Sequence, residues 1–467
     1  MKAIWCLLLA SSFFFVACKK TDTPKPPTPT ASKQDLIKDS VYLYTKEVYL
    51  WQDVIPSYDQ FNPRKYSGST DLEIAQNVMN GIRSLQPLDR FSMVLSREAS
   101  SGLQTGEDTD FGFFVSAGNV NGTVNWYVSY VYDESTAGKA GVQRGWYINK
   151  INGSTIRYDQ PSVNILNNIF FGSATSASFE FVKADGTPTT FTLNKTSFVS
   201  NSVLYKNVLD AGGKKVGYFV FNQFFGAPSR KELAQVFNSF QSQGISELIV
   251  DLRYNPGGSV ETQDTLSNLI APTAANGRVM YQYIFNSTLQ QNKHQLIRKK
   301  MGYGDWFAPG DNTVSFQKAG NLNLSRVFFI VGSGTASASE LLINNLKPYM
   351  DVKILGDTTY GKPVGFFPIP VYEFDIYPIS FKTVNSAGNA DYYNGFAPDK
   401  LVADGVNRNW GDINEPSLAA ALKYISTGSW GRFTAAEENR VKANEELQPL
   451  MRKVSENKFS GMFIEKK

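Results

Sequence analysis

The chain has 467 residues, of which 42% are hydrophobic and 19% charged, a composition typical of a globular protein rather than a disordered or fibrous one. This length exceeds what one hydrophobic core usually holds, so we expect two or three domains. The 46 basic and 42 acidic residues nearly balance, which gives no electrostatic reason to expect a nucleic-acid partner.

The first residues predict export. Lys2 precedes an apolar run over 3–17 that suits the core of a signal peptide and is too short for a stable membrane span. The run ends in Phe-Val-Ala-Cys at 15–18, which resembles a bacterial lipobox, where the signal is cut before a cysteine that then carries lipid. We therefore expect a lipoprotein signal over 1–17 and lipidation of Cys18. An ordinary secretory signal that happens to hold a cysteine near its cut site is the alternative.

The segment 18–32 is rich in proline and threonine and predicts an extended tether. Cys6, the other cysteine, lies in the signal, so the mature chain is expected to form no disulfide. No later segment has 18 consecutive apolar residues, and no transmembrane helix is expected in the mature protein. Lys19 and Lys20 favour the periplasmic side of an outer membrane in a bacterial envelope.

Apolar residues at helical spacing predict a helical domain over 33–100. A second helical, charged segment lies within 431–467 and is expected to act either as a packing or dimerisation arm or as a solvated cover. The sequence leaves open whether the protein forms a homo-oligomer. Between them, 101–199 predicts short strands at 112–115, 126–131, 145–151, 178–182 and 189–193 with a helix at 135–140. Over 200–430 strands alternate with helices, which predicts an α/β core with a mostly parallel sheet. Within it, 272–324 is irregular apart from some helix around 290–301.

The order of motifs in 101–199 resembles a PDZ domain rather than a generic β barrel. The resemblance rests on Phe-Gly-Phe-Phe at 111–114, Ala-Gly-Lys-Ala-Gly at 137–141 and Ile-Asn-Lys-Ile-Asn-Gly at 148–153; Trp146, where aspartate is usual, departs from it. In that family a peptide tail adds as a strand beside the loop of the first glycine. It therefore implies that a substrate tail binds at Phe111, Gly112, Phe113 and Phe114.

The chain has one histidine, His294, so a serine-histidine-acid triad or a multi-histidine metal site has too few residues. We expect no metal and no cofactor. A serine activated by lysine remains possible, and Ser337 lies where a predicted strand gives way to a helix, whose free amides suit an oxyanion. Taken alone, Ser337 and Glu340 favour a helix capping box over a catalytic role.

Lys362 stands in a glycine-rich loop beside the apolar Val364, Phe366 and Phe367. Lysine acts as a base only when burial or nearby positive charge lowers its pKa, and these neighbours would supply an apolar wall. A surface lysine in a turn is the alternative.

Together these motifs resemble the carboxyl-terminal processing, or tail-specific, protease family, in which a serine box, a strand and a Gly-Lys loop follow one another. Lys362 follows Ser337 by 25 residues, the separation associated with the serine/lysine dyad of that family. Asn-Pro-Gly-Gly at 255–258, after a predicted strand, is similar to the family's oxyanion-hole glycines. The resemblance covers most of the mature chain and implies a core of the ClpP/crotonase type.

The resemblance implies a serine endopeptidase with Ser337 as nucleophile and Lys362 as base, and with amides of Ala338 and of Gly257 or Gly258 in the oxyanion hole. Phe366 occupies the place where many relatives have a glutamine that orients the lysine. Glu340 is the expected replacement, and Glu340→Gln should lower turnover while the protein stays folded.

The implied substrates are peptides or proteins with unstructured C-termini, and peptide capture would gate the site. A ligand carrier or peptide-binding scaffold on the same fold is the alternative, which Phe366 and the many aromatic residues favour. A hydrolase acting on non-peptide acyl groups is a third hypothesis, under which the PDZ-like domain has no evident use.

Overall fold

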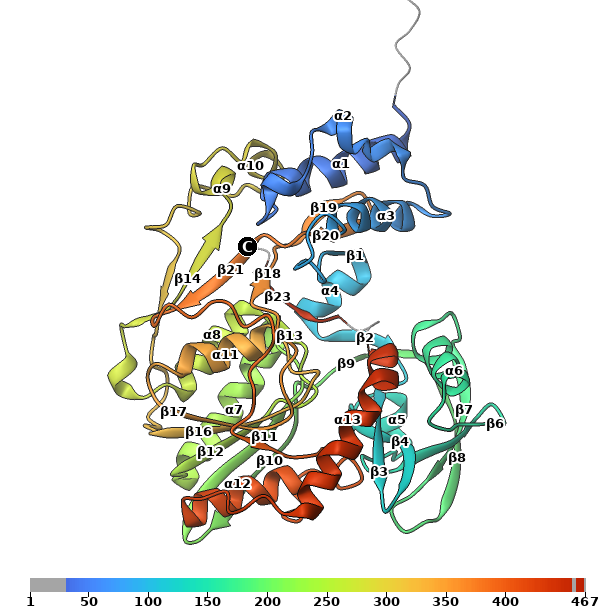
Figure 1. Cartoon of the computed structure of the whole chain (residues 1–467), viewed down its shortest axis with the longest axis vertical. Coiled ribbons are helices and arrows are strands. Elements are labelled where there is room, and N and C mark those ends of the chain that lie inside the picture. The colour runs from blue at the N-terminus through green and yellow to red at the C-terminus, as the bar shows by residue number, and fades with distance from the viewer. Residues whose placement is uncertain (1–30, 456–458, 466–467) are drawn as a thin grey trace, which may run out of the picture.

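The computed structural model describes residues 31–455 and 459–465 (Figure 1). The expected signal peptide, Cys18 and most of the tether lie outside these residues. Within the described ranges, no helix combines the length and hydropathy that crossing a bilayer requires.

Two helices dominate the N-terminal region, α1 (Lys33–Val48) and α3 (Asp71–Arg83), joined by the short helices η1 (Gln52–Val54), α2 (Tyr58–Phe61) and η2 (Pro63–Lys65). The Ser32 and Thr70 side chains accept hydrogen bonds from backbone amides in the first turns of α1 and α3, which fixes where both helices start. The sequence predicted a purely helical region, but the structure also contains a strand here. After α3 the chain forms β1 (Met93–Ser96), which pairs antiparallel with β20 (Phe374–Tyr377) of the core, and then α4 (Arg97–Thr105).

A separate β domain follows, with its own hydrophobic cluster around Phe111, Phe113, Phe179 and Phe181. Its main sheet has the order β3-β4-β5-β7-β8, so β3 is an edge strand. The predicted strands lie within or close to observed ones; helix α6, whose Asp159 side chain caps the Ser162 amide, was not predicted. The elements are β2 (Glu107–Asp110), β3 (Phe113–Val120), β4 (Thr123–Val131), α5 (Thr136–Lys139), β5 (Tyr147–Ile151), β6 (Ser154–Thr155), α6 (Gln160–Phe171), β7 (Ser176–Val182), β8 (Pro188–Asn194) and β9 (Thr196–Val199).

The core contains a six-stranded sheet in the order β10-β11-β12-β16-β17-β22, parallel except for the β10–β11 pair. Alternate residues of β11 face opposite sides, because side chains alternate along a strand: Phe219 and Phe221 pack with α7, and Tyr218 and Val220 with α12. The strands are β10 (Val203–Ala211), β11 (Lys214–Phe221), β12 (Glu247–Asp251), β16 (Arg326–Val331), β17 (Asp351–Gly356) and β22 (Lys400–Leu401). The helices are α7 (Ala227–Gln243), α8 (Val260–Ile270), α11 (Ala338–Leu346) and α12 (Pro416–Thr427).

Residues 272–324, for which the sequence predicted little, contribute strands to a second sheet with the order β15-β14-β21-β18. The helix expected around 290–301 is two short helices, α9 (Ser287–Gln290) and α10 (Gln295–Met301), interrupted by Asn292 with a φ of 57°. The remaining elements are η3 (Thr273–Ala275), β14 (Val279–Phe285), β15 (Thr313–Ser315), β18 (Val364–Gly365), β19 (Ile369–Val371) and β21 (Phe381–Asn385).

The sequence predicted a helical segment at the end of the chain, but the structure has a helix followed by a strand. Helix α13 (Ala435–Ser455) runs beside the β domain, as Figure 1 shows in red. After it, the short strand β23 (Gly461–Phe463) enters the core and pairs in parallel with β13 (Gly257–Ser259). The chain's final segment therefore joins the loop that carries the glycine pair.

Candidate active site

Ser337 stands at the junction between a core strand and a helix. β16 ends at Val331, and α11 begins at Ala338, directly after Ser337. The backbone of Ser337 has φ 58° and ψ −107°, a strained conformation for a residue with a side chain. Its Oγ is buried and has no hydrogen-bond partner among the residues that the structure describes. The hydroxyl is therefore free for chemistry.

The glycine pair packs against the start of α11. Gly257 and Gly258 have φ values of 107° and 138°, which favour glycine. A Cβ on Gly257 would lie 3.1 Å from the backbone nitrogen of Ala338, so glycine allows this loop to approach the helix amides. The Gly257 N–H already donates to Asn255 Oδ1 at 2.9 Å, which favours Gly258 over Gly257 as the second oxyanion donor.

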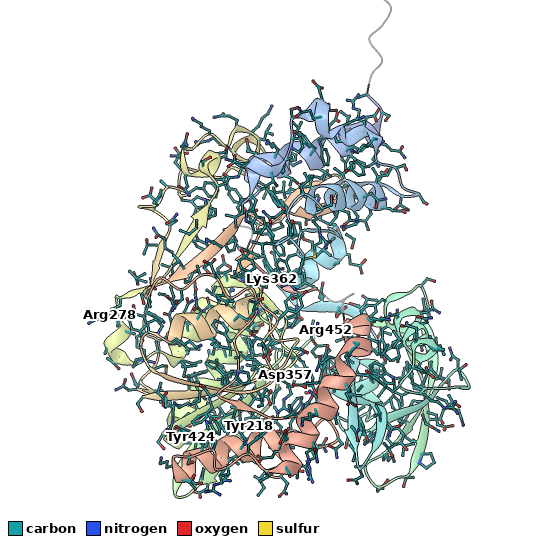
Figure 2. The ribbon with its side chains drawn as sticks, in the orientation of Figure 1. Tyr218, Arg278, Asp357, Lys362, Tyr424 and Arg452 are labelled. Carbon is teal, nitrogen blue, oxygen red and sulfur yellow. The ribbon has the colours of Figure 1, made fainter. Side chains whose placement is uncertain are left out.

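Lys362 is fully buried and close to two aromatic rings. Its Nζ lies 4.7 Å from the ring centre of Phe91 and 4.3 Å from that of Phe366. Burial lowers the pKa of Lys362 well below its ordinary value of 10.5, against the weaker pull of Asp89 and Glu340. The side chain has the property that a lysine base needs. In Figure 2 it lies near the middle of the molecule.

The lysine amine does not hydrogen-bond Ser337. Instead, Nζ donates to the backbone oxygen of Ser460 at 2.5 Å. The segment 459–465 thus lies directly against the predicted base.

Glu340 joins the two loops through their backbones. Its buried carboxylate accepts from the N–H of Ser337 at 2.9 Å and from the N–H of Lys362 at 2.8 Å. It also accepts from the Gly361 N–H at 2.7 Å and from Thr359 Oγ1 at 2.6 Å. Burial raises the pKa of Glu340, while these hydrogen bonds act in the opposite direction. The carboxylate has no hydrogen bond with Lys362 Nζ, so it positions the loops rather than orienting the amine.

Sequence reasoning missed two contributors to the site. Asp89 accepts from the Phe91 N–H at 2.9 Å and from the Tyr49 hydroxyl at 2.6 Å, which holds the turn that carries the Phe91 ring. The break in helical pattern at 87–92 was the available signal, but it did not show where the turn packs. The other contributor is Ser460, for which the sequence carried no signal.

The expected tail-binding residues lie where β3 begins. Phe111 and Phe113 point into the β-domain core, with ring centres each 5.2 Å from that of Phe179. Gly112 has a φ of 80°, and a Cβ there would overlap Ser135. Phe114 stacks on Tyr130. The neighbouring β3 edge, where a peptide strand would add, is packed by α13.

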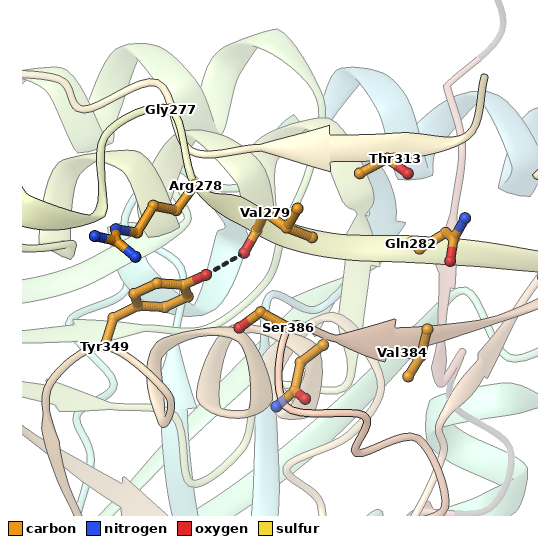
Figure 3. A pocket seen from close by; sticks show the side chains of 9 residues that line it. Gly277, Arg278, Val279, Gln282, Thr313, Tyr349, Val384 and Ser386 are labelled. Atoms are coloured by element: carbon orange, nitrogen blue, oxygen red, sulfur yellow. Dashed lines mark hydrogen bonds between the residues drawn. The ribbon is translucent and has the colours of Figure 1, made fainter. Parts of the chain in front are cut away.

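Other features of the described residues have fewer groups suited to catalysis. A surface hollow of about 540 Å³ has no lysine, histidine or carboxylate in its lining (Figure 3). It is lined by Gly277, Arg278, Val279, Gln282, Thr313, Tyr349, Val384, Asn385 and Ser386. His294 is buried against Phe307, and neither ring nitrogen has a hydrogen-bond partner among the residues described. Over those same residues, histidine, cysteine and carboxylate side chains form no group suited to a metal.

The sequence profile of peptidase family S41 matches residues 215–399, a range that holds the glycine pair, Ser337, Glu340 and Lys362. Residues 215–399 of this chain therefore carry a peptidase family S41 domain, and the chain is similar to CtpA-like serine proteases. It is thus a serine-type peptidase.

Relatives and solved structures agree with this family. The S41 chain is 27% identical over 231 residues to a probable CtpA-like serine protease of Staphylococcus saprophyticus, an alignment that spans 50% of this chain and 41% of the relative. It is 23% identical over 408 residues to that of Staphylococcus aureus strain N315, covering 81% and 74% of the two chains.

Two solved structures share its mixed α/β multidomain fold. One is a Bacteroides fragilis chain assigned to the S41 proteases, with a TM-score of 0.63, 23% identity and coverage of 86% of this chain and 100% of that one. The other is the photosystem II D1 C-terminal processing protease, with a TM-score of 0.50, 17% identity and coverage of 85% and 99%. At these identities the likeness concerns the fold alone.

Proposed function

We propose that this S41 peptidase is an endopeptidase that cleaves unstructured protein chains near their C-termini with Ser337 and Lys362 as its catalytic dyad. The observation that carries the proposal is the state of Lys362, a fully buried amine whose pKa is lowered and which, among the described residues, bonds a backbone carbonyl oxygen and no carboxylate. Glu340 binds the backbones of both dyad residues and so fixes the loops relative to each other.

In the proposed reaction, the neutral Lys362 amine takes the proton of Ser337 Oγ as that oxygen attacks the carbonyl carbon of the substrate. The carbonyl oxygen gains the negative charge, which the amides of Ala338 and Gly258 stabilise at the start of α11. Collapse of the intermediate breaks the C–N bond, and Lys362 returns the proton to the leaving amine. A water, deprotonated by Lys362, then attacks the acyl carbon. The ester bond to Ser337 Oγ breaks, and Lys362 returns the proton to that oxygen.

For substrate recognition we propose that the β domain acts as a PDZ-like module. Edge strand β3 and the positive-φ turn at Gly112 suit the addition of a peptide strand and the capture of its carboxylate. Since α13 packs on β3, peptide binding requires a shift of this helix and would favour an open arrangement. The same peptide with an amidated C-terminus should then be cleaved more slowly.

We further propose that the enzyme is exported and held by lipid on Cys18 at the periplasmic side of an outer membrane, which the lipobox-like residues 15–18 support. Its partners would be protein substrates of the envelope. Labelling cells with a radioactive fatty acid tests the anchor: Cys18→Ser should abolish incorporation of the label.

The full chain, purified in detergent, should cleave the disordered protein casein, with products identified by mass spectrometry. Ser337→Ala and Lys362→Ala should each lose cleavage while they stay folded by circular dichroism. Ser242→Ala, at an exposed serine near the end of α7, is the control for the serine. Lys347→Ala is the control for the lysine, because Lys347 also lies over an aromatic ring, 4.4 Å from the centre of Phe396, but outside the site.

Full cleavage by either dyad variant would overturn the assignment. An inactive wild-type chain, over varied proteins and peptides, would instead support a ligand carrier or scaffold on the same fold.

A further inference from the structure

The residues 459–465, which we call the inserted segment, lie in the proposed active site as a β-strand. β23 pairs in parallel with β13, so that Gly461 lies opposite Gly257 and Met462 opposite Gly258. On its other side the segment bonds to the lysine loop: the Phe366 N–H donates to Met462 O, and the Ile464 N–H donates to Phe366 O, each at 3.1 Å. The inserted segment is therefore paired on both sides, with the oxyanion-hole loop on one side and with the Lys362 loop on the other.

The inserted segment meets the dyad through its backbone carbonyls. Ser460 O accepts from Lys362 Nζ. A Cβ on Gly257 would lie 2.5 Å from Gly461 O and 3.1 Å from the Ala338 nitrogen, so this carbonyl oxygen and the oxyanion-hole amide approach the same point. A peptide substrate must present its carbonyl to these same groups.

Only glycine fits at position 461. A Cβ there would lie 2.7 Å from the Phe366 ring and 2.9 Å from Lys362 Nζ. The next three side chains, of Met462, Phe463 and Ile464, are buried with 0%, 1% and 6% exposure. The Glu465 carboxylate pairs with Arg230 and accepts from Ser259 Oγ at 2.5 Å. The segment is thus fixed by shape, apolar burial and one ion pair.

Helix α13, just before the inserted segment, contacts both catalytic loops. Gln448 accepts from Ser333 Oγ at 2.9 Å, and its Nε2 donates to Asp357 Oδ2 at 3.3 Å. Ser333 lies four residues before Ser337, and Asp357 five before Lys362. The helix also contributes Leu447 and Val454 to the core of the β domain and packs on β3 and α6. It therefore covers the edge to which we assign the substrate tail.

We infer that this peptidase is inhibited by its own chain: the inserted segment occupies the place of a bound peptide substrate, and α13 closes the peptide-binding edge of the β domain. This inference rests on the proposed function for the identity of the site. The resting enzyme is then closed, and a substrate must displace both elements before Ser337 can act. Displacement by one long protein substrate, which reaches both places, is favoured over displacement by a short peptide.

The test uses the full chain with Gly461→Val, which changes the inserted segment and none of the proposed catalytic groups. If the segment fills the site in about 90% of resting molecules, its displacement should raise kcat/KM on casein about tenfold. Glu465→Gln, which removes the charge that pairs with Arg230 and weakens the hydrogen bond from Ser259 Oγ, should give a smaller rise. Gly304→Val is the matched control, because Gly304 is exposed and a Cβ there meets nothing within 4 Å; it should leave kcat/KM unchanged.

A second readout does not depend on activity. A fluorescein-labelled peptide with the sequence of 459–465 should bind the Gly461→Val chain, as followed by fluorescence anisotropy, and should inhibit its casein cleavage competitively. The wild-type chain should bind it at least about tenfold more weakly, because its own segment competes.

Unchanged kcat/KM in a folded Gly461→Val chain, together with absence of peptide binding, would overturn the inference while leaving the proposed function intact. Peptide binding without cleavage of any substrate would instead overturn the proposed function while supporting occupancy of the groove.

Discussion

Two buried cations in this molecule are surrounded in opposite ways. Arg253, after β12, is 4% exposed and bonds Asp251, Asp404 and Glu415 at 2.7–2.9 Å. Burial alone would lower its pKa, but these carboxylates raise the pKa of Arg253 well above its ordinary value. Lys362, after β17, is equally buried but has two aromatic rings and a carbonyl oxygen as neighbours, and its pKa is lowered.

The difference separates a structural cation from a reactive one. Carboxylates around Arg253 hold its charge permanently and fix the loop that leads to the glycine pair. Around Lys362 the charged form lacks such support, so the neutral amine, which can accept a proton, becomes accessible. Four experiments distinguish these two environments.

The largest effect is expected at the reactive cation. Lys362→Arg keeps a positive charge that cannot act as a base, and Lys362→Met keeps the bulk without a base, so both should lose about 10²–10⁴-fold in kcat. Steady-state cleavage of casein measures the loss. A chain that retains near-wild-type kcat with methionine at 362 would show that the amine is not the base.

The structural cation should instead affect folding. Arg253→Met leaves Asp251 and Glu415 buried without their partner and should lower the free energy of unfolding by about 3–5 kcal/mol, as measured by urea denaturation. Arg408→Met serves as the comparison, since the pair of Arg408 with Asp412 is partly exposed and should contribute about 0.5 kcal/mol or less. Equal stability of the two variants would contradict the role assigned to the Arg253 cluster.

Glu340→Gln should produce a smaller, mixed effect. The amide offers fewer acceptor sites to the four hydrogen-bond donors around it, which should cost about 1–3 kcal/mol of stability. Because the Glu340 charge raises the pKa of Lys362, its removal should also move the midpoint of the pH–kcat/KM profile to lower pH. A loss of stability with an unmoved midpoint would reduce Glu340 to a purely structural residue.

The smallest effect is expected from a change of pH. Because the folded pKa of Lys362 lies below 10.5, the unfolded chain binds a proton at Lys362 in a pH window where the folded chain does not. Stability should therefore rise with pH across that window, by at most about 1.4 kcal/mol per pH unit, and the slope should be absent in Lys362→Met. The kcat/KM should rise as the pH passes through the folded pKa of Lys362, at the low-pH edge of that window, and stay level above it. A slope shared by both chains would place its origin elsewhere.

The sequence predicted well whatever depends on local pattern. The strands that precede Ser337 and the glycine pair are continuous apolar runs, and Pro-Gly-Gly and Gly-Lys mark their loops, so the serine box and lysine loop were found without coordinates. The neighbourhood of Lys362 was predicted only in part. Phe366, four residues away, was expected as an apolar wall and does contact the amine.

Long-range packing could not be predicted. Phe91 reaches Lys362 from a turn 271 residues earlier in the chain, held there by Asp89 and Tyr49. The inserted segment has the sequence Phe-Ser-Gly-Met-Phe-Ile-Glu, which a pattern search reads as an unremarkable apolar end to a helix. Its pairing with β13 depends on the shape of a site that exists only in the folded molecule.

The backbone of Ser337 has one further consequence. A side chain at φ 58° and ψ −107° carries a conformational cost that glycine would not, of the order of 1–3 kcal/mol. Random mutagenesis screened for heat resistance alone should therefore recover glycine at 337, and each such clone would have exchanged its nucleophile for a higher melting temperature. At residue 337, thermal stability and catalytic turnover therefore compete.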